Sequence, residues 1–141
     1  QLGQMHHALY KYGKDNYEYM IFNDLDEYLF IPDIKLVEYI KLNTDINIFG
    51  FKNIWAKTKN NIKKIEENLY ISEALNFECR SKCIYKVSSI ETINIHYYDK
   101  MLENKKMICD NYMFHFYNWC KKYRRIETPI SKKINLNFLY I

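Results

Sequence analysis

The strongest structural signal in the chain comes from residues 19–30, which read YMIFNDLDEYLF. The stretch begins with four apolar residues, a pattern typical of a short strand buried on both faces of a sheet. It stops at Asn23 and is followed by three carboxylates, Asp24, Asp26 and Glu27. Because α/β folds keep their chemistry at the C-terminal ends of strands, this order predicts an α/β fold with a site at the acidic cluster.

The segments on either side of this stretch have helical patterns. Residues 1–14 place Leu2, Met5 and Leu9 at helical spacing, and Gly13 is expected to cap the helix at its C-terminal end. After the acidic cluster, Pro32 and Asp33 supply helix-start chemistry. The apolar stripe of this second helix, which is expected to end near Leu42, consists of Leu36, Val37 and Ile40.

The rest of the chain predicts strands that complete a sheet. Residues 46–55 are rich in β-branched and aromatic side chains, which predicts a strand, and Gly50 suggests a bulge in it. Residues 56–69 are expected to form an exposed loop or short helix that could border an acceptor site. Two strands, 82–87 and 92–98, are expected around a Ser88-Ser89 turn, and alternation puts His96 on the polar face of the second. A strand at 112–116 and a basic helix at 118–126 follow.

Composition restricts the class of protein. The chain has 141 residues, the size of one domain, and its 17% aromatic content with only 3 Gly and 2 Pro excludes a disordered protein. The net charge of +4 is modest and spread out, except for the basic run at 121–125. No signal peptide is visible and no apolar run approaches the ~18 residues that span a bilayer, so a soluble, cytoplasmic protein is expected.

Four cysteines, Cys79, Cys83, Cys109 and Cys120, lack the paired CxxC spacing of a zinc site. We expect reduced thiols packed mostly in the core, which fits a reducing compartment. Two disulfides are the alternative.

The acidic cluster is the candidate site. Three carboxylates within one turn can hold a hard divalent cation and leave open positions for phosphate oxygens. The alternative is an acidic turn that only joins a strand to a helix. A DxD pattern by itself does not decide between them.

The order of motifs around the cluster does favour a site. A helix with Gln4, a short strand, DLDEYL at 24–29, Pro32 and a helix resemble the central stretch of family 92 glycosyltransferases and related GT-A enzymes, which carry a "DxDEF" signature there. Residues 82–86, KCIYK, leading to His96 resemble the family's Lys-X-Ile strand and "vH" element. His115 with Tyr117 resembles the closing "HY" element, although the family usually has His-Tyr-Arg where this chain has His-Phe-Tyr.

This resemblance implies a GT-A-like mixed sheet flanked by helices, without the N-terminal nucleotide-binding strands. The partial GT-A domain would span residues 1–126, with 127–141 as a C-terminal tail. The implied activity is inverting, metal-dependent transfer of a hexose, with galactose the family's best-known case, from a nucleotide diphosphate sugar such as a UDP-sugar to a glycan or other hydroxyl acceptor. A short, inactive form of such an enzyme is the other possibility.

Residue roles follow from the resemblance. Asp26 would bind Mn²⁺ or Mg²⁺, and Asp24 would contact the metal or the ribose of the donor. Glu27 is a candidate catalytic residue that would point towards the sugar; the alternative is that it only positions the turn. His96 is the first choice and His115 the second for a histidine ligand, which would favour Mn²⁺.

Other side chains are weaker candidates. Lys82 and Arg80 would add positive charge near the phosphates, with solvated surface as the alternative. For the catalytic base, Asp99 and Glu73 are available. Trp55 and Trp119 would stack on a sugar or pack in the core.

Two further functions remain open. A nonenzymatic module could use the basic run at 121–125 to bind nucleic acid or an acidic partner, whereas the glycosyltransferase interpretation expects no nucleic acid. A metal-dependent phosphoesterase could use Asp24, Asp26, Glu27 and a histidine.

Overall fold

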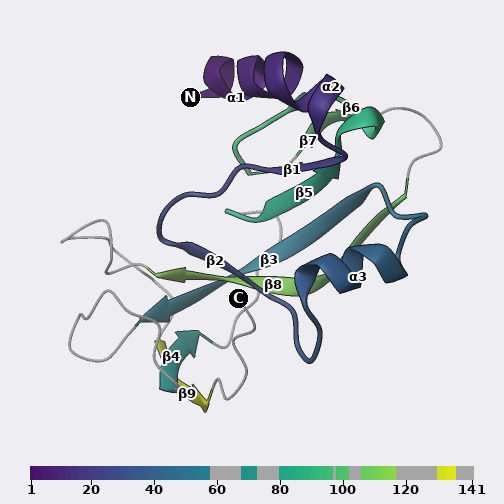
Figure 1. The fold of residues 1–141 in the computed structure, drawn as a ribbon. Helices are drawn as coiled ribbons and strands as arrows, with labels where there is room; N and C mark the ends of the chain where they lie inside the picture. The colour runs from purple at the N-terminus through teal and green to yellow at the C-terminus, as the bar shows by residue number, and fades with distance from the viewer. Residues whose placement is uncertain (58–67, 73–79, 97, 102–105, 117–129, 136–141) are drawn as a thin grey trace.

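A mixed β-sheet forms the centre of the molecule. The computed structural model describes residues 1–57, 68–72, 80–96, 98–101, 106–116 and 130–135 (Figure 1). Its seven-stranded sheet is built around β3 (Ile48–Lys57), which pairs in parallel with β8 (Met107–Phe116) along most of its length. This is the α/β architecture with a mixed sheet that the sequence predicts.

The remaining strands of this sheet are antiparallel to their neighbours. Along the other edge of β3 lie β5 (Lys82–Lys86) and, further on, β4 (Asn68–Ser72). Outside β5 lies β1 (Tyr19–Ile21), outside β8 lies β2 (Glu27–Phe30), and β9 (Ile130–Asn135) pairs with β4. The run at 19–22 was expected to be buried on both faces, but β1 is an edge strand whose side chains are only half-buried.

The N-terminal helix is longer than predicted. It consists of α1 (Leu2–Ala8), a π-helical turn (Leu9–Gly13) and α2 (Lys14–Asn16) in succession. Gly13 is therefore not the cap: it has helical φ of −72°, and the chain becomes extended only at Tyr17. A Cβ at Gly13 would meet the sulfur of Met20, so close approach to β1 explains this glycine.

The second helix, α3 (Leu36–Leu42), ends where the sequence predicts but begins later. Asp33 adopts φ of 63° in a turn, and Lys35 is the N-cap residue. Tyr39 rather than Val37 completes the buried stripe, since Val37 is 61% exposed.

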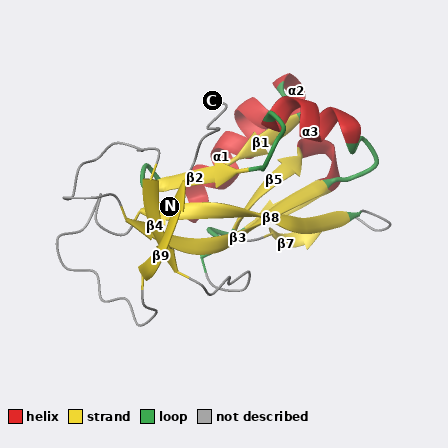
Figure 2. Ribbon diagram, turned by 90° about the horizontal axis from the view of Figure 1, so that it is seen from below, coloured by secondary structure: helices red, strands yellow, loops and turns green. Residues whose placement is uncertain are grey.

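Helices cover both faces of the sheet near β5, and Figure 2 shows them gathered at the end of the molecule away from β4 and β9. On one face Met5 and Leu9 of the N-terminal helix pack against Cys83 and Tyr85 of β5. On the other face α3 packs on Phe49, Phe51, Ile84 and Met113. A third apolar cluster lies near β4 and contains Ile54, Ala56, Leu69, Ile71, Phe114 and Phe116.

The predicted strand at 92–98 is two strands. A 3-10 turn (Val87–Ser89) leads into β6 (Ile90–Ile93), which pairs only with β7 (Tyr98–Met101) in a separate two-stranded sheet beside α1 (Figure 1). His96 thus lies in the connection between these strands and not on a strand face. Ile90 and Ile93 are fully buried, which explains why the chain turns here to pack on α1.

Other predicted elements are confirmed with altered limits. The register between β3 and β8 shifts between Phe49 and Phe51, which confirms the bulge at Gly50. The expected loop at 56–69 is shorter, because Ala56 and Leu69 belong to strands and are fully buried. Strand β8 begins at Met107, five residues before the predicted start at 112.

Several expectations fall on residues outside the described part. These are the basic helix at 118–126, the basic run at 121–125, Tyr117, Glu73, Trp119, Cys79 and Cys120. The segment 127–141, expected to be a tail, contributes β9 to the sheet. Both described cysteines, Cys83 and Cys109, are free thiols. Among the described residues no helix combines the length and apolar character needed to cross a membrane.

Candidate functional site

The acidic cluster forms a hydrogen-bonded turn between β1 and β2. The backbone N–H of Glu27 donates to the carbonyl of Asp24 at 3.1 Å, and the backbone N–H of Asp24 donates to Oε2 of Glu27 at 2.8 Å. The carbonyl of Asp26 accepts a 2.7 Å hydrogen bond from the backbone N–H of Phe116. These bonds fix the turn against the C-terminal end of β8.

Lys82 provides the positive charge beneath this turn. Its side chain is 3% exposed, and its Nζ lies 3.3 Å from Oε2 of Glu27 and 3.5 Å from Oδ2 of Asp24. It also donates to the carbonyl oxygen of Ile95 at 3.1 Å. Three acceptors match the three donors of an ammonium group, which makes its burial tolerable.

Glu27 is a buried carboxylate, and one of its two oxygens accepts a hydrogen bond. Burial raises its pKa, while the backbone N–H of Asp24 and the charge of Lys82 act in the opposite direction. Its other oxygen, Oε1, has no hydrogen-bond partner within the part of the chain that the structure describes. Nδ1 of His115 lies 3.9 Å from that oxygen. The site therefore retains unused acceptor capacity next to a histidine.

His115 connects the acidic turn to the sheet. The antiparallel register places it opposite Glu27 of β2, and the parallel register places it beside Trp55 of β3. Its Nε2 lies 3.5 Å from Oδ2 of Asp26, and its Nδ1 lies 3.1 Å from Oδ1 of Asn53. His115, Asp26 and Asn53 are all buried.

Strand alternation explains why these side chains meet. Residues 51, 53 and 55 of β3 lie on one face of the sheet. Residues 113 and 115 of β8 and residues 27 and 29 of β2 lie on the same face. This is the face that α3 covers further along, at Phe49 and Ile84. The polar site therefore begins where the cover of α3 ends, at the C-terminal ends of the parallel strands β3 and β8, the edge where α/β sheets bind ligands.

The described residues offer few protein ligands for a divalent cation. No trio of His, Cys, Asp or Glu side chains among the described residues is close enough to enclose an ion. Asp26 Oδ2 and His115 Nε2, however, are 3.5 Å apart, a separation compatible with two ligands that each bind one ion at roughly 2.1 Å. Mg²⁺-type ions commonly take only one or two protein carboxylates and fill the rest of their shell with phosphates and water.

The two candidate histidines are not equivalent. His96 is half-buried, and burial together with the charges of Lys82 and Arg80 lowers its pKa. Its Nδ1 has no hydrogen-bond partner among the described residues, and its carbonyl accepts a 3.4 Å hydrogen bond from the Ser81 hydroxyl. His115, the second choice from the sequence, is the one that contacts Asp26.

The other predicted residues are placed around this centre. Arg80 has φ of 62° and holds its guanidinium 5.5 Å from the ring centre of Trp55, whose indole lies 4.5 Å from the ring of His115. Asp99 lies on β7, and its side chain is outside the described part.

Sequence reasoning missed Asn53. The available signal was its position two residues before Trp55 on a strand, which puts both side chains on one face.

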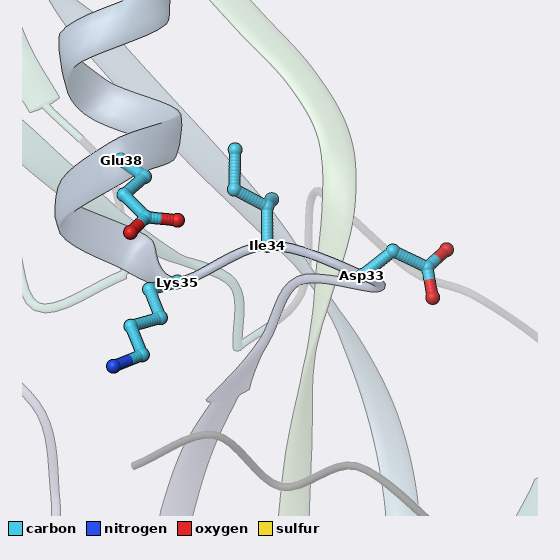
Figure 3. A pocket seen from close by; sticks show the side chains of 4 residues that line it. All are labelled: Asp33, Ile34, Lys35 and Glu38. Atoms are coloured by element: carbon cyan, nitrogen blue, oxygen red, sulfur yellow. The ribbon is translucent and has the colours of Figure 1, made fainter.

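The structure also has a small surface pocket at the start of α3 (Figure 3). It is lined by Asp33, Ile34, Lys35 and Glu38, of which Ile34 is half-buried and the other three are exposed. None of these residues belongs to the acidic turn, and no buried polar group faces the pocket. It is not a candidate for the substrate site.

Comparison with known proteins identifies the family of the chain. No curated protein showed significant similarity to the chain. The family model described as glycosyltransferase family 92 matches residues 1–138, which include the acidic turn, Lys82 and His115. Because this match covers nearly the whole chain, the protein belongs to glycosyltransferase family 92.

Proposed function

We propose that this chain carries the metal and diphosphate part of an inverting glycosyltransferase site, which uses a UDP-sugar, with galactose as the first sugar to test, and a hydroxyl group of a glycan as acceptor. The observation that supports this most is the contact between Asp26 and His115 beside a fixed acidic turn. Family membership supplies the reaction class.

Three side chains would hold Mn²⁺ or Mg²⁺. Asp26 and His115 are the two buried candidates, and Asp24, whose side chain is 48% exposed, is available to the metal or to the donor ribose. A histidine ligand favours Mn²⁺ over Mg²⁺. The cation would neutralise charge on the departing nucleoside diphosphate.

The chain's other residues prepare this site. Glu27 holds the turn through the backbone N–H of Asp24, so we assign it to positioning rather than to proton transfer. Lys82 keeps the Asp24 carboxylate in place from below and adds positive charge near the phosphates. Arg80 is exposed and brings a second positive charge to the same region.

In the proposed reaction the acceptor oxygen forms a bond to the anomeric carbon while the bond from that carbon to the diphosphate oxygen breaks. A carboxylate takes the proton from the acceptor hydroxyl, which makes this a single displacement with inversion. Asp99 is our candidate for this base because it lies in β7, the strand that follows the connection carrying Ile95 and His96.

The test is UDP release from a panel of UDP-sugars with Mn²⁺, after removal of metal by EDTA and after its return. We expect Mn²⁺-dependent release in the wild type, and a loss of 100-fold or more, on the order of 3 kcal/mol, in Asp26→Asn. Asp45→Asn is the control, because Asp45 pairs with Lys106 before β3 begins, at the other end of that strand from Trp55. UDP release that depends neither on Mn²⁺ nor on Asp26 would contradict the proposal. Hydrolysis of phosphate esters in the absence of a sugar donor would also contradict it.

A further inference from the structure

We propose that Trp55 is a positioning residue for Arg80: it holds the Arg80 guanidinium beside the acidic turn, where Arg80 contacts the diphosphate of the donor. This inference rests on the proposed function, because it names residues that bind part of the same donor. Trp55 then serves the reaction through Arg80 and not as a surface on which a sugar stacks.

The guanidinium of Arg80 is held by an aromatic ring. It lies over the ring of Trp55, 5.5 Å from the ring centre. Trp55 is half-buried and Arg80 is exposed, so the sheet anchors the ring while the guanidinium stays in contact with solvent. Within the part of the chain that the structure describes, Arg80 pairs with no carboxylate. A guanidinium over a ring keeps the N–H groups at its edge for an anion, and it binds phosphate oxygens two at a time.

The backbone at Arg80 gives an independent reason to assign a function to its side chain. Its φ of 62° lies in the left-handed region, which glycine adopts without steric cost and most other residues rarely adopt. The chain nevertheless has an arginine here, directly before Ser81 and β5. Residues held in such conformations cluster at functional sites. The turn alone would be better made by a glycine, so the side chain is what this position supplies.

A series of contacts leads from Arg80 to the acidic turn. The ring of Trp55 lies 4.5 Å from the ring of His115, and Nε2 of His115 lies 3.5 Å from Oδ2 of Asp26. Lys82, two residues after Arg80, pairs with two other carboxylates of the same turn. This arrangement places a solvent-accessible positive charge next to the site, where it can bind the diphosphate of a donor.

The main test is isothermal titration calorimetry of UDP in the presence of Mn²⁺ with the whole chain. Arg80→Gln removes the charge, and we expect UDP to bind about 10–100-fold more weakly. Trp55→Leu removes the ring and should weaken UDP binding by about 2–5-fold, whereas Trp55→Phe keeps an aromatic face and should recover most of that loss. Lys11→Gln is the matched control: it removes an equal charge that lies 5.2 Å from the ring centre of Tyr12, and it should leave UDP binding unchanged.

A double variant shows whether Trp55 acts through Arg80. If it does, the chain that carries both Arg80→Gln and Trp55→Leu should bind UDP as well as Arg80→Gln alone. A further 2–5-fold loss in the double variant would mean that Trp55 contacts the ligand by itself, and this would overturn its role as a positioning residue.

Inorganic pyrophosphate with Mn²⁺ is the second probe, because it carries the diphosphate without a nucleoside. Arg80→Gln should weaken the binding of pyrophosphate and of UDP by a similar factor. Unchanged binding of pyrophosphate beside weaker binding of UDP would place Arg80 at the nucleoside and overturn the inference.

Arg80→Gly separates binding from folding. Glycine suits the left-handed backbone, so the unfolding temperature without ligand should equal or exceed that of the wild type, while UDP binding should fall as in Arg80→Gln. A lower unfolding temperature with unchanged UDP binding would assign Arg80 to the fold and overturn the inference.

The outcomes also separate the two proposals. If the wild type binds UDP with Mn²⁺ and Arg80→Gln binds it equally well, the role of Arg80 and Trp55 is rejected and the proposed function stands. If the wild type binds no UDP with Mn²⁺, the proposed function fails and this inference fails with it.

Discussion

At the scale of single residues, the buried ammonium group of Lys82 lies 3.5 Å from a carboxylate oxygen of Asp24 and 3.3 Å from one of Glu27. Removing one partner of a buried pair leaves the other charge uncompensated, which typically destabilises a protein by about 3–5 kcal/mol. We therefore predict a loss of about 3–5 kcal/mol in Lys82→Met, measured by urea unfolding.

The control for this prediction lies on the same strand. Lys86→Met removes the 3.6 Å pair with Glu18, whose side chain is 70% exposed. Such a surface pair contributes less than about 1 kcal/mol. Equal losses in the two variants would show that Lys82 does not stabilise the acidic turn.

Cys83 gives a prediction about pH. Burial, with smaller effects from Cys109, raises the pKa of its thiol to about 12 from the ordinary 9.0. At pH 8 about one thiol in ten thousand is then ionised instead of about one in ten, so alkylation of Cys83 in the folded protein should be about a thousandfold slower than in urea. Mass spectrometry of the labelled peptides measures this, and rapid labelling without urea would contradict it.

The same pKa shift makes stability depend on alkaline pH. Because the folded pKa is raised, the contribution of Cys83 is fully present below pH 9 and is lost as the pH rises towards about 12. Cys83→Ala should reduce the decline in unfolding free energy over that window, by at most about 1.4 kcal/mol per pH unit.

Individual site residues differ in how far the sequence reveals them. Asp24, Asp26 and Glu27 are predictable because they are adjacent in the chain and follow an apolar strand. The sequence puts His96 ahead of His115 because alternation places His96 on a polar strand face. In the structure His115 is the histidine that contacts Asp26, and His96 lies in the connection between β6 and β7. Only the register of β2 against β8 brings His115, which is 88 residues from Glu27 in the sequence, next to the turn.

At the scale of secondary structure, two glycines of the N-terminal helix provide a matched pair. Gly13 lies against Met20, whose sulfur occupies the space of a Cβ, whereas nothing lies within 4 Å of a Cβ built on Gly3. Gly3→Ala should stabilise the protein by up to about 1 kcal/mol through helix propensity alone. Gly13→Ala should instead destabilise it, because overpacking of about 1–3 kcal/mol exceeds that gain.

Thermal and urea unfolding of both variants would measure the difference. Stabilisation of similar size in Gly3→Ala and Gly13→Ala would mean that Met20 moves aside without loss. It would also mean that contact between the helix and β1 does not require a glycine.

The elements that the sequence mispredicted share a physical cause. Gly13 is a residue type that often caps a helix, but here it lies inside the helix, where its lack of a side chain allows close packing against Met20. Residues 92–98 alternate like one strand, yet burial of Ile90 and Ile93 under α1 divides them into β6 and β7. Local propensity does not include such long-range contacts, whereas the bulge at Gly50 and the end of α3 depend on local chemistry and were predicted correctly.

At the scale of the whole molecule, the site depends on four strands that are far apart in the sequence. Its charged side chains come from the turn before β2, from the first residue of β5 and from the end of β8, and Asn53 and Trp55 come from β3. The sequence predicts an α/β fold and an acidic site because those signals are local. It does not predict that Asn53 meets His115, because this contact depends on the parallel register of β3 and β8.

The central claim is that the acidic turn and His115 bind a divalent cation together with a UDP-sugar. The most direct test is thermal unfolding with Mn²⁺, with UDP-galactose and with both, in the wild type, Asp26→Asn and Asp45→Asn. Ligand at about a hundred times its dissociation constant adds about 2.7 kcal/mol, or roughly 5–10 °C for a domain of this size. We predict a shift that needs both ligands, survives in Asp45→Asn and disappears in Asp26→Asn; an unchanged unfolding temperature in the wild type, or a shift that Asp26→Asn retains, would contradict the claim.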